Sequence, residues 1–234
     1  MRQLTLFNDL ILTPRADQKE VKIMLKQLCK RGAVIGTDEA GRGALAGPVI
    51  GASVYLTPAQ EKKLVAMKLR DSKKMTPKTR EKLFEAMQEM GVLWEIHSGT
   101  IQRIERDNIL QASLWSMGMS AKKIAQKLDK PLACVIVDGT ERIPKLDYPQ
   151  WTLIMADNLV PAVSAASVVA KVLRDRLMVE LSPKYPEYNF AQNKGYPTAE
   201  HMDTVARIGM SKVHRPYFCK KIVELNRGSI NAVD

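Results

Sequence analysis

The chain has 234 residues, of which 45% are hydrophobic, so its length and composition suit one ordinary domain with a real core. Its formal net charge of +11 points to a polyanionic partner, most often nucleic acid, although a basic protein without such a partner can have the same composition. Its apolar runs are too short to span a bilayer, no signal peptide opens it and its three cysteines lie far apart, so we expect a cytoplasmic protein with free thiols and no membrane contact.

In chain order, the sequence predicts an early β-rich stretch followed by alternating strands and helices. Residues 16–31 carry apolar side chains at helical spacing, and two β runs, 33–38 and 48–56, flank a glycine turn. Further helices are predicted at 76–91, 108–128, 162–181, 198–209 and 216–225, further strands at 92–100, 132–139 and 151–157, and a loose tail from 226. This order predicts an α/β fold in which a sheet with an antiparallel hairpin is covered by helices.

Carboxylates stand at the ends of three predicted strands. Asp38, Asp138 and Asp157 each close an apolar run, and Glu39 directly follows Asp38. One such acid is often only a turn or capping residue, but functional sites also collect at the strand ends of an open α/β sheet. Oxygen ligands without histidine or cysteine favour Mg²⁺ or Mn²⁺ over zinc. Two such ions, about 3.5–4 Å apart, promote phosphodiester hydrolysis, which suits a basic protein.

The glycine turn after Glu39 matches no nucleotide-binding motif. Gly41, Gly43 and Gly47 are spaced one residue too far apart for the dinucleotide fingerprint, and no Gly-Lys-Ser/Thr follows, so neither a dinucleotide-dependent oxidoreductase nor a P-loop is predicted. Exposed backbone groups in such a turn suit recognition of a 2′-hydroxyl, which distinguishes RNA from DNA. His201 and His214 belong to no zinc motif; they either touch phosphate or pack inside the protein.

Ordered segments between about residues 32 and 225 extend these signals. They are GTDEAGRGALAGPV, DSKKM, NILQAS, VIVDG, SAASVVAKVLRDRLM, NKGYPTAEH and HRPYF. In this order they resemble the signature of bacterial ribonuclease HII. The resemblance implies an RNase H-like fold, with a central mixed β-sheet flanked by helices and a C-terminal helical part. It also implies an endonuclease of DNA replication and repair, which cuts the RNA strand of RNA/DNA hybrids and cuts 5′ of single ribonucleotides in duplex DNA, leaving a 3′-hydroxyl and a 5′-phosphate.

The resemblance implies roles for individual residues as well. The catalytic carboxylates, binding two divalent ions (Mn²⁺ or Mg²⁺), would be Asp38, Glu39, Asp138 and Asp157. Substrate contacts would come from the backbone of Gly41, Arg42 and Gly43 at the 2′-hydroxyl, from Tyr196 beside the ribonucleotide–deoxyribonucleotide junction, and from Ser72, Lys73, Lys171 and Arg174 at phosphates.

One position departs from the family pattern. The acid at 157 usually follows a Lys-Gly pair, and here Met155 and Ala156 precede it. Because alanine adopts a positive φ less readily than glycine, we expect a different local backbone or a shifted Asp157. The missing lysine also removes one cation near the substrate.

The peptide QLTLF at residues 3–7 lies outside the family core. It resembles the motif by which bacterial replication and repair proteins dock on the sliding β-clamp, with Gln3, Leu4, Leu6 and Phe7 as the contacts. The alternative is that its apolar side chains pack on the enzyme as an extra strand. We therefore expect a monomer with an N-terminal extension at 1–31, a catalytic domain at 32–227 and a flexible tail at 228–234.

Two other functions compete with this interpretation. Ribonuclease HIII, a sister enzyme, is expected to carry an additional N-terminal substrate-binding domain, for which about thirty residues leave no room. A non-catalytic nucleic-acid-binding module gains nothing from clustered carboxylates that face phosphates.

Overall fold

The computed structural model describes residues 17–69, 72 and 75–230, and the side chains up to residue 223. The strands are β1 (Ala33–Ala40), β2 (Val49–Tyr55), β3 (Leu93–Gly99), β4 (Leu132–Asp138) and β5 (Gln150–Leu153). The α-helices are α1 (Gln18–Cys29), α2 (Pro58–Ala66), α3 (Pro77–Glu89), α4 (Ile101–Asp107), α5 (Ile109–Lys127), α6 (Ala156–Leu159), α7 (Pro161–Leu181), α8 (Phe190–Asn193), α9 (Ala199–Ile208) and α10 (Pro216–Ile230), with short 3₁₀ turns at Ser182–Lys184 and Pro186–Tyr188.

The strands form one mixed sheet in the order β3-β2-β1-β4-β5. β1, β2 and β3 are joined antiparallel, whereas β4 runs parallel to β1 and β5 runs parallel to β4. The predicted hairpin and the mixed sheet are therefore confirmed. Because β1 and β4 are parallel neighbours, with Thr37 opposite Val137, the acids that follow these two residues emerge at the same edge.

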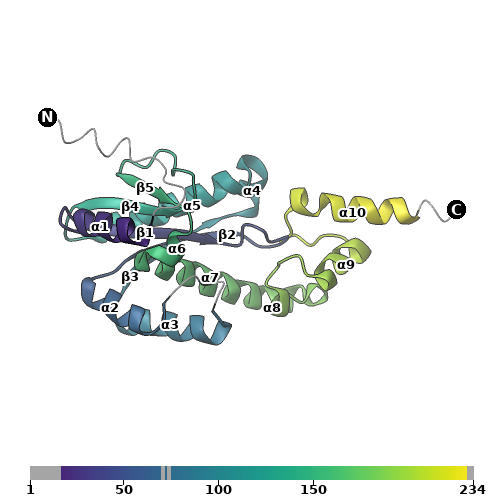
Figure 1. The fold of residues 1–234 in the computed structure, drawn as a ribbon. Helices are drawn as coiled ribbons and strands as arrows, with labels where there is room; N and C mark the ends of the chain where they lie inside the picture. The colour runs from purple at the N-terminus through teal and green to yellow at the C-terminus, as the bar shows by residue number, and fades with distance from the viewer. Residues whose placement is uncertain (1–16, 70–71, 73–74, 231–234) are drawn as a thin grey trace.

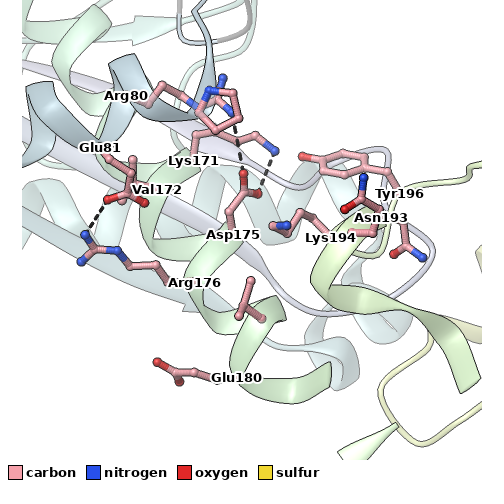
Figure 2. Close-up of a pocket in the computed structure, with 13 residues that line it drawn as sticks. Arg80, Glu81, Lys171, Val172, Asp175, Arg176, Glu180, Asn193, Lys194 and Tyr196 are labelled. Atoms are coloured by element: carbon pink, nitrogen blue, oxygen red, sulfur yellow. Dashed lines mark hydrogen bonds and ion pairs between the residues drawn. The ribbon is translucent and has the colours of Figure 1, made fainter. Parts of the chain in front are cut away.

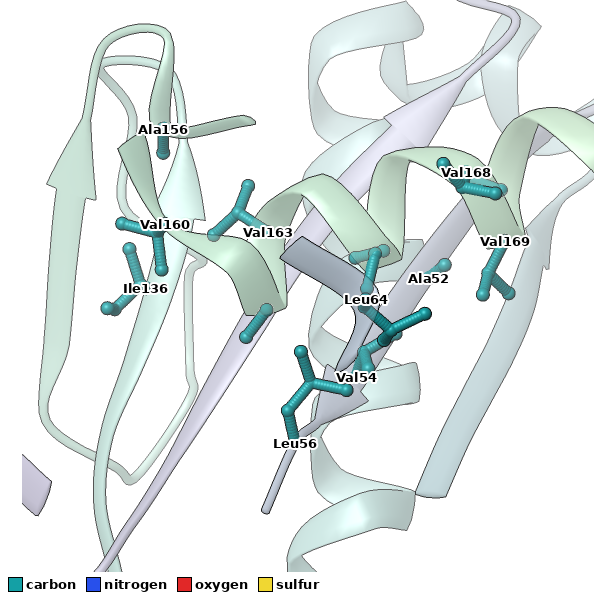
Figure 3. Packing of buried hydrophobic residues seen from close by; sticks show 14 of the residues in the cluster. Ala52, Val54, Leu56, Leu64, Ile136, Ala156, Val160, Val163, Val168 and Val169 are labelled. Carbon is teal, nitrogen blue, oxygen red and sulfur yellow. The ribbon is translucent and has the colours of Figure 1, made fainter. Parts of the chain in front are cut away.

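Helices cover both faces of the sheet. α5 packs on β2 and β3 on one face, and α7 packs on β1 and β2 on the other, with α2 and α3 beyond it (Figure 1). The inner face of α7 is made of small and branched side chains, which let the helix lie close to the strands. Figure 3 shows Val168 and Val169 of this helix near Ala52 of β2, and Val163 near Val160 and Ile136.

The C-terminal helices form a separate part beyond the end of the sheet (Figure 1). They share a small core of their own, in which Phe190, Val205 and Cys219 are fully buried. Leu45 and Ala46, from the loop between β1 and β2, belong to the same core. The loop that carries the glycine turn is thus held between the sheet and the C-terminal helices.

Two predicted boundaries differ from the structure. The run 151–157 is not one strand, because β5 ends at Leu153 and Asp157 lies in the short helix α6. The last helix continues to Ile230, beyond residue 225 and into the predicted tail.

Candidate active site

Three predicted carboxylates lie at the same end of the neighbouring strands β1 and β4. Asp38 is 4% exposed, and Glu39 and Asp138 are partly buried beside it. Burial raises the pKa of Asp38 well above its ordinary value, and the negative charges of Glu39 and then Asp138 raise it further. Such mutual repulsion among buried acids is what a divalent cation between them would relieve.

Asp38 and Asp138 are fixed by hydrogen bonds from neighbouring elements. The Glu39 N–H donates to Asp38 Oδ1 at 2.7 Å, and a side-chain hydrogen bond from Ser167 of α7 favours the ionised form of Asp38. The Ala156 N–H, at the start of α6, donates to Asp138 Oδ1 at 2.8 Å. Each acid therefore keeps its orientation through a contact with another part of the site.

Asp157 lies in the short helix α6 and not at the end of a strand, where the sequence predicted it. Its carboxylate accepts a hydrogen bond from the Asn158 side chain at 2.9 Å, and its carbonyl accepts one from Ser164 Oγ at 2.6 Å. It follows Ala156, whose N–H is bonded to Asp138, so α6 connects the two acids. Within residues 17–69, 72 and 75–230, no three His, Cys, Asp or Glu side chains converge closely enough to form a ready-made metal site.

Met155 and Ala156 replace the family's Lys-Gly pair, and the residue with a positive φ is Met155, one position before the expected one. Met155 has φ 55° and ψ 37°, which is the left-handed region, whereas Ala156 begins the helix and is fully buried. The Met155 side chain is 59% exposed. The positive φ of this turn is therefore at Met155 and not at Ala156, so the strain lies at Met155.

The glycine turn is held from below by two buried arginines. Gly41 has φ +98°, and a Cβ on it would lie 2.0 Å from Arg174 Nε. Arg174 is 0% exposed and donates to the carbonyls of Ala46 (3.0 Å), Pro48 (3.1 Å) and Lys194 (2.9 Å). The prediction that Arg174 contacts phosphate is therefore wrong, because its donors are used inside the protein.

The second buried arginine, Arg215, has a structural role that the sequence did not predict. Arg215 is also 0% exposed, and it donates to the carbonyls of Gly47 (2.8 Å) and Arg42 (3.0 Å). The side chain of Arg42 itself is half exposed and lies 3.3 Å from Glu39. Gly43 faces open space, with nothing within 4 Å of a Cβ built on it. The turn is thus held on one side by Arg174 and Arg215 and is exposed at Gly43.

Tyr196 lies beside the turn, at the rim of a cavity of about 560 Å³ between α3, α7 and α8 (Figure 2). The next residue back, Gly195, accepts hydrogen bonds from Leu45 and Ala46 of the glycine loop, at 2.8 and 3.3 Å. Lys171 Nζ lies 4.6 Å from the Tyr196 ring centroid and bonds Asp175 at 2.8 Å. The structure therefore brings Tyr196, Lys171 and the glycine turn together.

The remaining predicted residues are placed less simply. Ser72 is buried and shares a 2.7 Å hydrogen bond with Ser167, so it supports the serine that holds Asp38 and does not reach a phosphate. Lys73 lies outside the described residues, as do Gln3, Leu4, Leu6 and Phe7 of the predicted clamp peptide.

Comparison with known proteins identifies the chain. The mixed sheet in this order, with acids on the neighbouring strands β1 and β4, has the RNase H-like fold: it agrees with the crystal structure of ribonuclease H2 from Pyrococcus horikoshii OT3 (TM-score 0.62, 26% identity, 83% of this chain and 99% of that one). The family model for Ribonuclease HII matches residues 35–221. Ribonuclease HII of Acaryochloris marina is 40% identical over 185 residues, 79% of this chain and 91% of that protein. The chain belongs to the ribonuclease HII family.

Membership of this family decides between the functions that the sequence left open. The chain is a ribonuclease H, a hydrolase that cuts RNA in RNA/DNA hybrids, and neither ribonuclease HIII nor a non-catalytic binding module. A solved PCNA:RNase HII complex from Archaeoglobus fulgidus shares the fold (TM-score 0.65, 23% identity, 83% of this chain and 96% of that one). Among the described helices, none combines the length and hydropathy that crossing a bilayer requires.

Proposed function

We propose that this enzyme also cuts duplex DNA on the 5′ side of a single embedded ribonucleotide, leaving a 3′-hydroxyl and a 5′-phosphate. The observation that carries this proposal is the rigid, open glycine turn directly after the acids. Gly41 is locked over Arg174, while Gly43 leaves its backbone accessible two residues further on. A backbone that approaches one sugar closely discriminates a ribose from a deoxyribose at that nucleotide, without needing a long hybrid.

The hydrolysis depends on divalent ions held by Asp38, Glu39, Asp138 and Asp157. The donor set fits Mg²⁺ or Mn²⁺, because it offers only carboxylate oxygens and because Glu39 and Asp138 both repel the negative charge of Asp38. When bound, two such ions would supply an activated water and charge stabilisation for the leaving oxygen. The protein's part is to hold these acids at the scissile phosphate and the ribose against the glycine turn.

Tyr196, Lys171 and Arg42 complete the proposed substrate site. Tyr196 offers a ring for stacking beside the ribonucleotide and a hydroxyl for hydrogen bonding. Lys171 and Arg42 offer cations, and each already contacts an acid, so they bring positive charge without a large unpaired desolvation cost.

The test is cleavage of a labelled duplex with one ribonucleotide, compared with an all-DNA duplex and a long RNA/DNA hybrid. We expect cleavage at the 5′ side of the ribonucleotide only with Mg²⁺ or Mn²⁺, and at least a 10³-fold loss for Asp38→Asn or Asp138→Asn, on the scale of removed charge stabilisation. Duplex binding by these variants should persist and weaken steeply with salt, because it depends on cations. Cleavage in excess chelator would refute the metal assignment, and cleavage of hybrids alone would refute the single-ribonucleotide activity.

We further propose that residues 3–7 dock the enzyme on the bacterial sliding β-clamp. The support is the complete QLTLF pattern, with apolar Leu6 and Phe7 at its end. Because only a few residues are ordered on binding, the affinity should be modest, on the order of micromolar. Clamp titrated against wild type and Leu6→Ala/Phe7→Ala separates the outcomes: equal binding by both proteins excludes docking, and a loss of cleavage on a short duplex by the double variant indicates packing on the enzyme instead.

A further inference from the structure

Two buried histidines, which the catalytic site does not use, contact each other behind Tyr196. His201, in the first turns of α9, is 0% exposed, and His214, just before α10, is 2% exposed. Their Nε2 atoms lie 3.0 Å apart. His201 Nδ1 is 2.9 Å from the carbonyl oxygen of Tyr196, and at the other end His214 Nδ1 is 3.0 Å from the Ser211 N–H nitrogen.

The outer partners fix the direction of every hydrogen bond in this chain. The Tyr196 carbonyl only accepts, so His201 carries its proton on Nδ1 and leaves Nε2 bare. The Ser211 N–H only donates, so His214 leaves Nδ1 bare to accept from it and from the Ser211 hydroxyl at 2.8 Å, and carries its proton on Nε2. The His214 Nε2–H therefore donates to His201 Nε2, and only one pair of neutral tautomers satisfies all four nitrogens.

The two ends of the histidine chain bind to the Tyr196 segment and to the segment that supports the glycine loop. One end grips the backbone of Tyr196, whose N–H is bonded to Asn193. The other end belongs to the segment that holds the glycine loop, since the carbonyl of Val213 accepts from Gly47 N–H at 2.8 Å and His214 itself forms a β-bridge with Ala46. His201 and His214 thus connect Tyr196 to the segment that holds the glycine turn, and this hydrogen-bonded pair is called the strut below.

We propose that His201 and His214 are positioning residues that set Tyr196 at a fixed distance from the glycine turn and so determine selectivity for a ribonucleotide. This inference rests on the substrate role proposed above for Tyr196 and the turn. Neither imidazole touches the substrate. Their contribution is to hold the Tyr196 backbone against the loop, so that stacking and 2′-hydroxyl recognition occur at one nucleotide.

The surroundings support a neutral, rigid pair. Phe190 lies 5.5 Å from the His201 ring, and Tyr188 lies 4.6 Å from the His214 ring. Burial lowers the pKa of both imidazoles, and for His214 the neighbouring His201 lowers it further, to about 4. A proton added to either ring would place two donors face to face, so the strut keeps its hydrogen bonds only while both rings are neutral.

The first test is direct and needs no activity. Long-range ¹H–¹⁵N spectra of the wild-type protein near neutral pH report which ring nitrogens carry protons. We expect a His201 signal of the Nδ1–H form and a His214 signal of the Nε2–H form. The opposite tautomer in either ring, or a cationic ring, would overturn the proposal even if every variant failed to fold.

The second test separates positioning from general stability by a double-mutant cycle. His201→Ala should lower kcat/KM on a single-ribonucleotide duplex by about ten-fold in the wild-type background, and by less than about two-fold in a Tyr196→Ala background, because the strut then has nothing to position. His201→Asn keeps a donor near the δ position and should recover part of the loss. His97→Ala is the matched control, since His97 lies on β3 against Trp115, away from this segment.

The outcomes are distinguishable from failure of the proposed function. An equal loss in both backgrounds, or a loss explained by the unfolded fraction alone, would refute positioning. If the wild-type enzyme did not cut the single-ribonucleotide duplex at all while both tautomers were as expected, the single-ribonucleotide activity would be refuted and the strut would remain.

Discussion

The two glycines of the turn should respond to alanine in opposite ways. Gly41 has φ +98° and packs on Arg174, whereas Gly43 has no positive φ in the structure and faces open space. An alanine at 41 adopts a left-handed backbone at a cost of about 1–2 kcal/mol. It also displaces a buried guanidinium that bonds three carbonyls, and losing even one such charged bond costs about 1.5–3 kcal/mol. Gly41→Ala should therefore lower the free energy of unfolding by about 2–5 kcal/mol.

Gly43→Ala should leave stability within about 0.5 kcal/mol of wild type, because its methyl group meets nothing and its backbone suits alanine. Its methyl group would nevertheless occupy the space that the proposed ribose needs. We expect a loss of at least ten-fold in kcat/KM on a single-ribonucleotide duplex without a change in unfolding. The pair thus separates a glycine that the fold requires from one that the substrate requires.

The assay is urea unfolding followed by circular dichroism, with kcat/KM measured on the same preparations. For a domain of this size each kcal/mol corresponds to about 2–4 °C in Tm, so Gly41→Ala should also be visible by thermal unfolding. Gly41→Ala with wild-type stability would refute the packing of the turn on Arg174. Gly43→Ala with wild-type activity would refute close approach of the turn to the ribose.

Three further predictions concern Tyr196, His214 and the start of α6 at Met155 and Ala156. Tyr196→Phe keeps the ring and should lose less activity on a single-ribonucleotide duplex than Tyr196→Ala; equal losses in kinetic assays would show that the ring does not stack. Because the pKa of His214 is lowered to about 4 from its ordinary value of 6.5, the unfolded state binds the proton more tightly, and the free energy of unfolding should fall by about 2–3 kcal/mol as pH drops from about 6.5 to 4, less so in His214→Gln. Met155→Gly should raise the urea midpoint by relieving about 1 kcal/mol of left-handed strain, whereas Ala156→Gly should lower it by a similar amount, since that position is helical and buried.

The strands and the paired acids were predictable from local patterns. An apolar run that ends in an acid indicates each of the strands β1 and β4. The alternation of strands with helices between them is typical of parallel pairing, which the structure has. The position of Asp157 was not predictable in the same way. The apolar run continues past Leu153, but the strand stops because Met155 turns left-handed and the Ala156 N–H bonds Asp138, a contact across 18 residues. No local pattern contains that partner.

The roles of Arg174 and Arg215 were also not predictable from local patterns, because their hydrogen-bond partners are distant in the sequence. A basic residue near a nucleic-acid site suggests a phosphate contact, and for Arg174 that interpretation fails because its donors bond Ala46 and Pro48, more than 120 residues away in the sequence. Arg215 stands in the HRPYF segment, which indicates the family but no role for this residue. Burial, which the sequence does not reveal for a charged residue, decides between a substrate contact and a structural one.

The choice of carbonyls as partners for these arginines has a consequence for the acids. A guanidinium paired with Asp38 or Asp138 would neutralise the charge that a divalent cation must meet. Arg174 and Arg215 instead donate to main-chain oxygens of the glycine loop, so they stiffen the turn while the acids keep their mutual repulsion. Among the described ion pairs, the cation that contacts one of these acids is Arg42, which pairs with Glu39. Its side chain is half exposed, so solvent screens the pair and a substrate phosphate would compete with Glu39 for the guanidinium. Rigidity on one side of the turn and negative charge on the other are thus kept apart within a few residues, which is the arrangement that the proposed cleavage beside a single ribose requires.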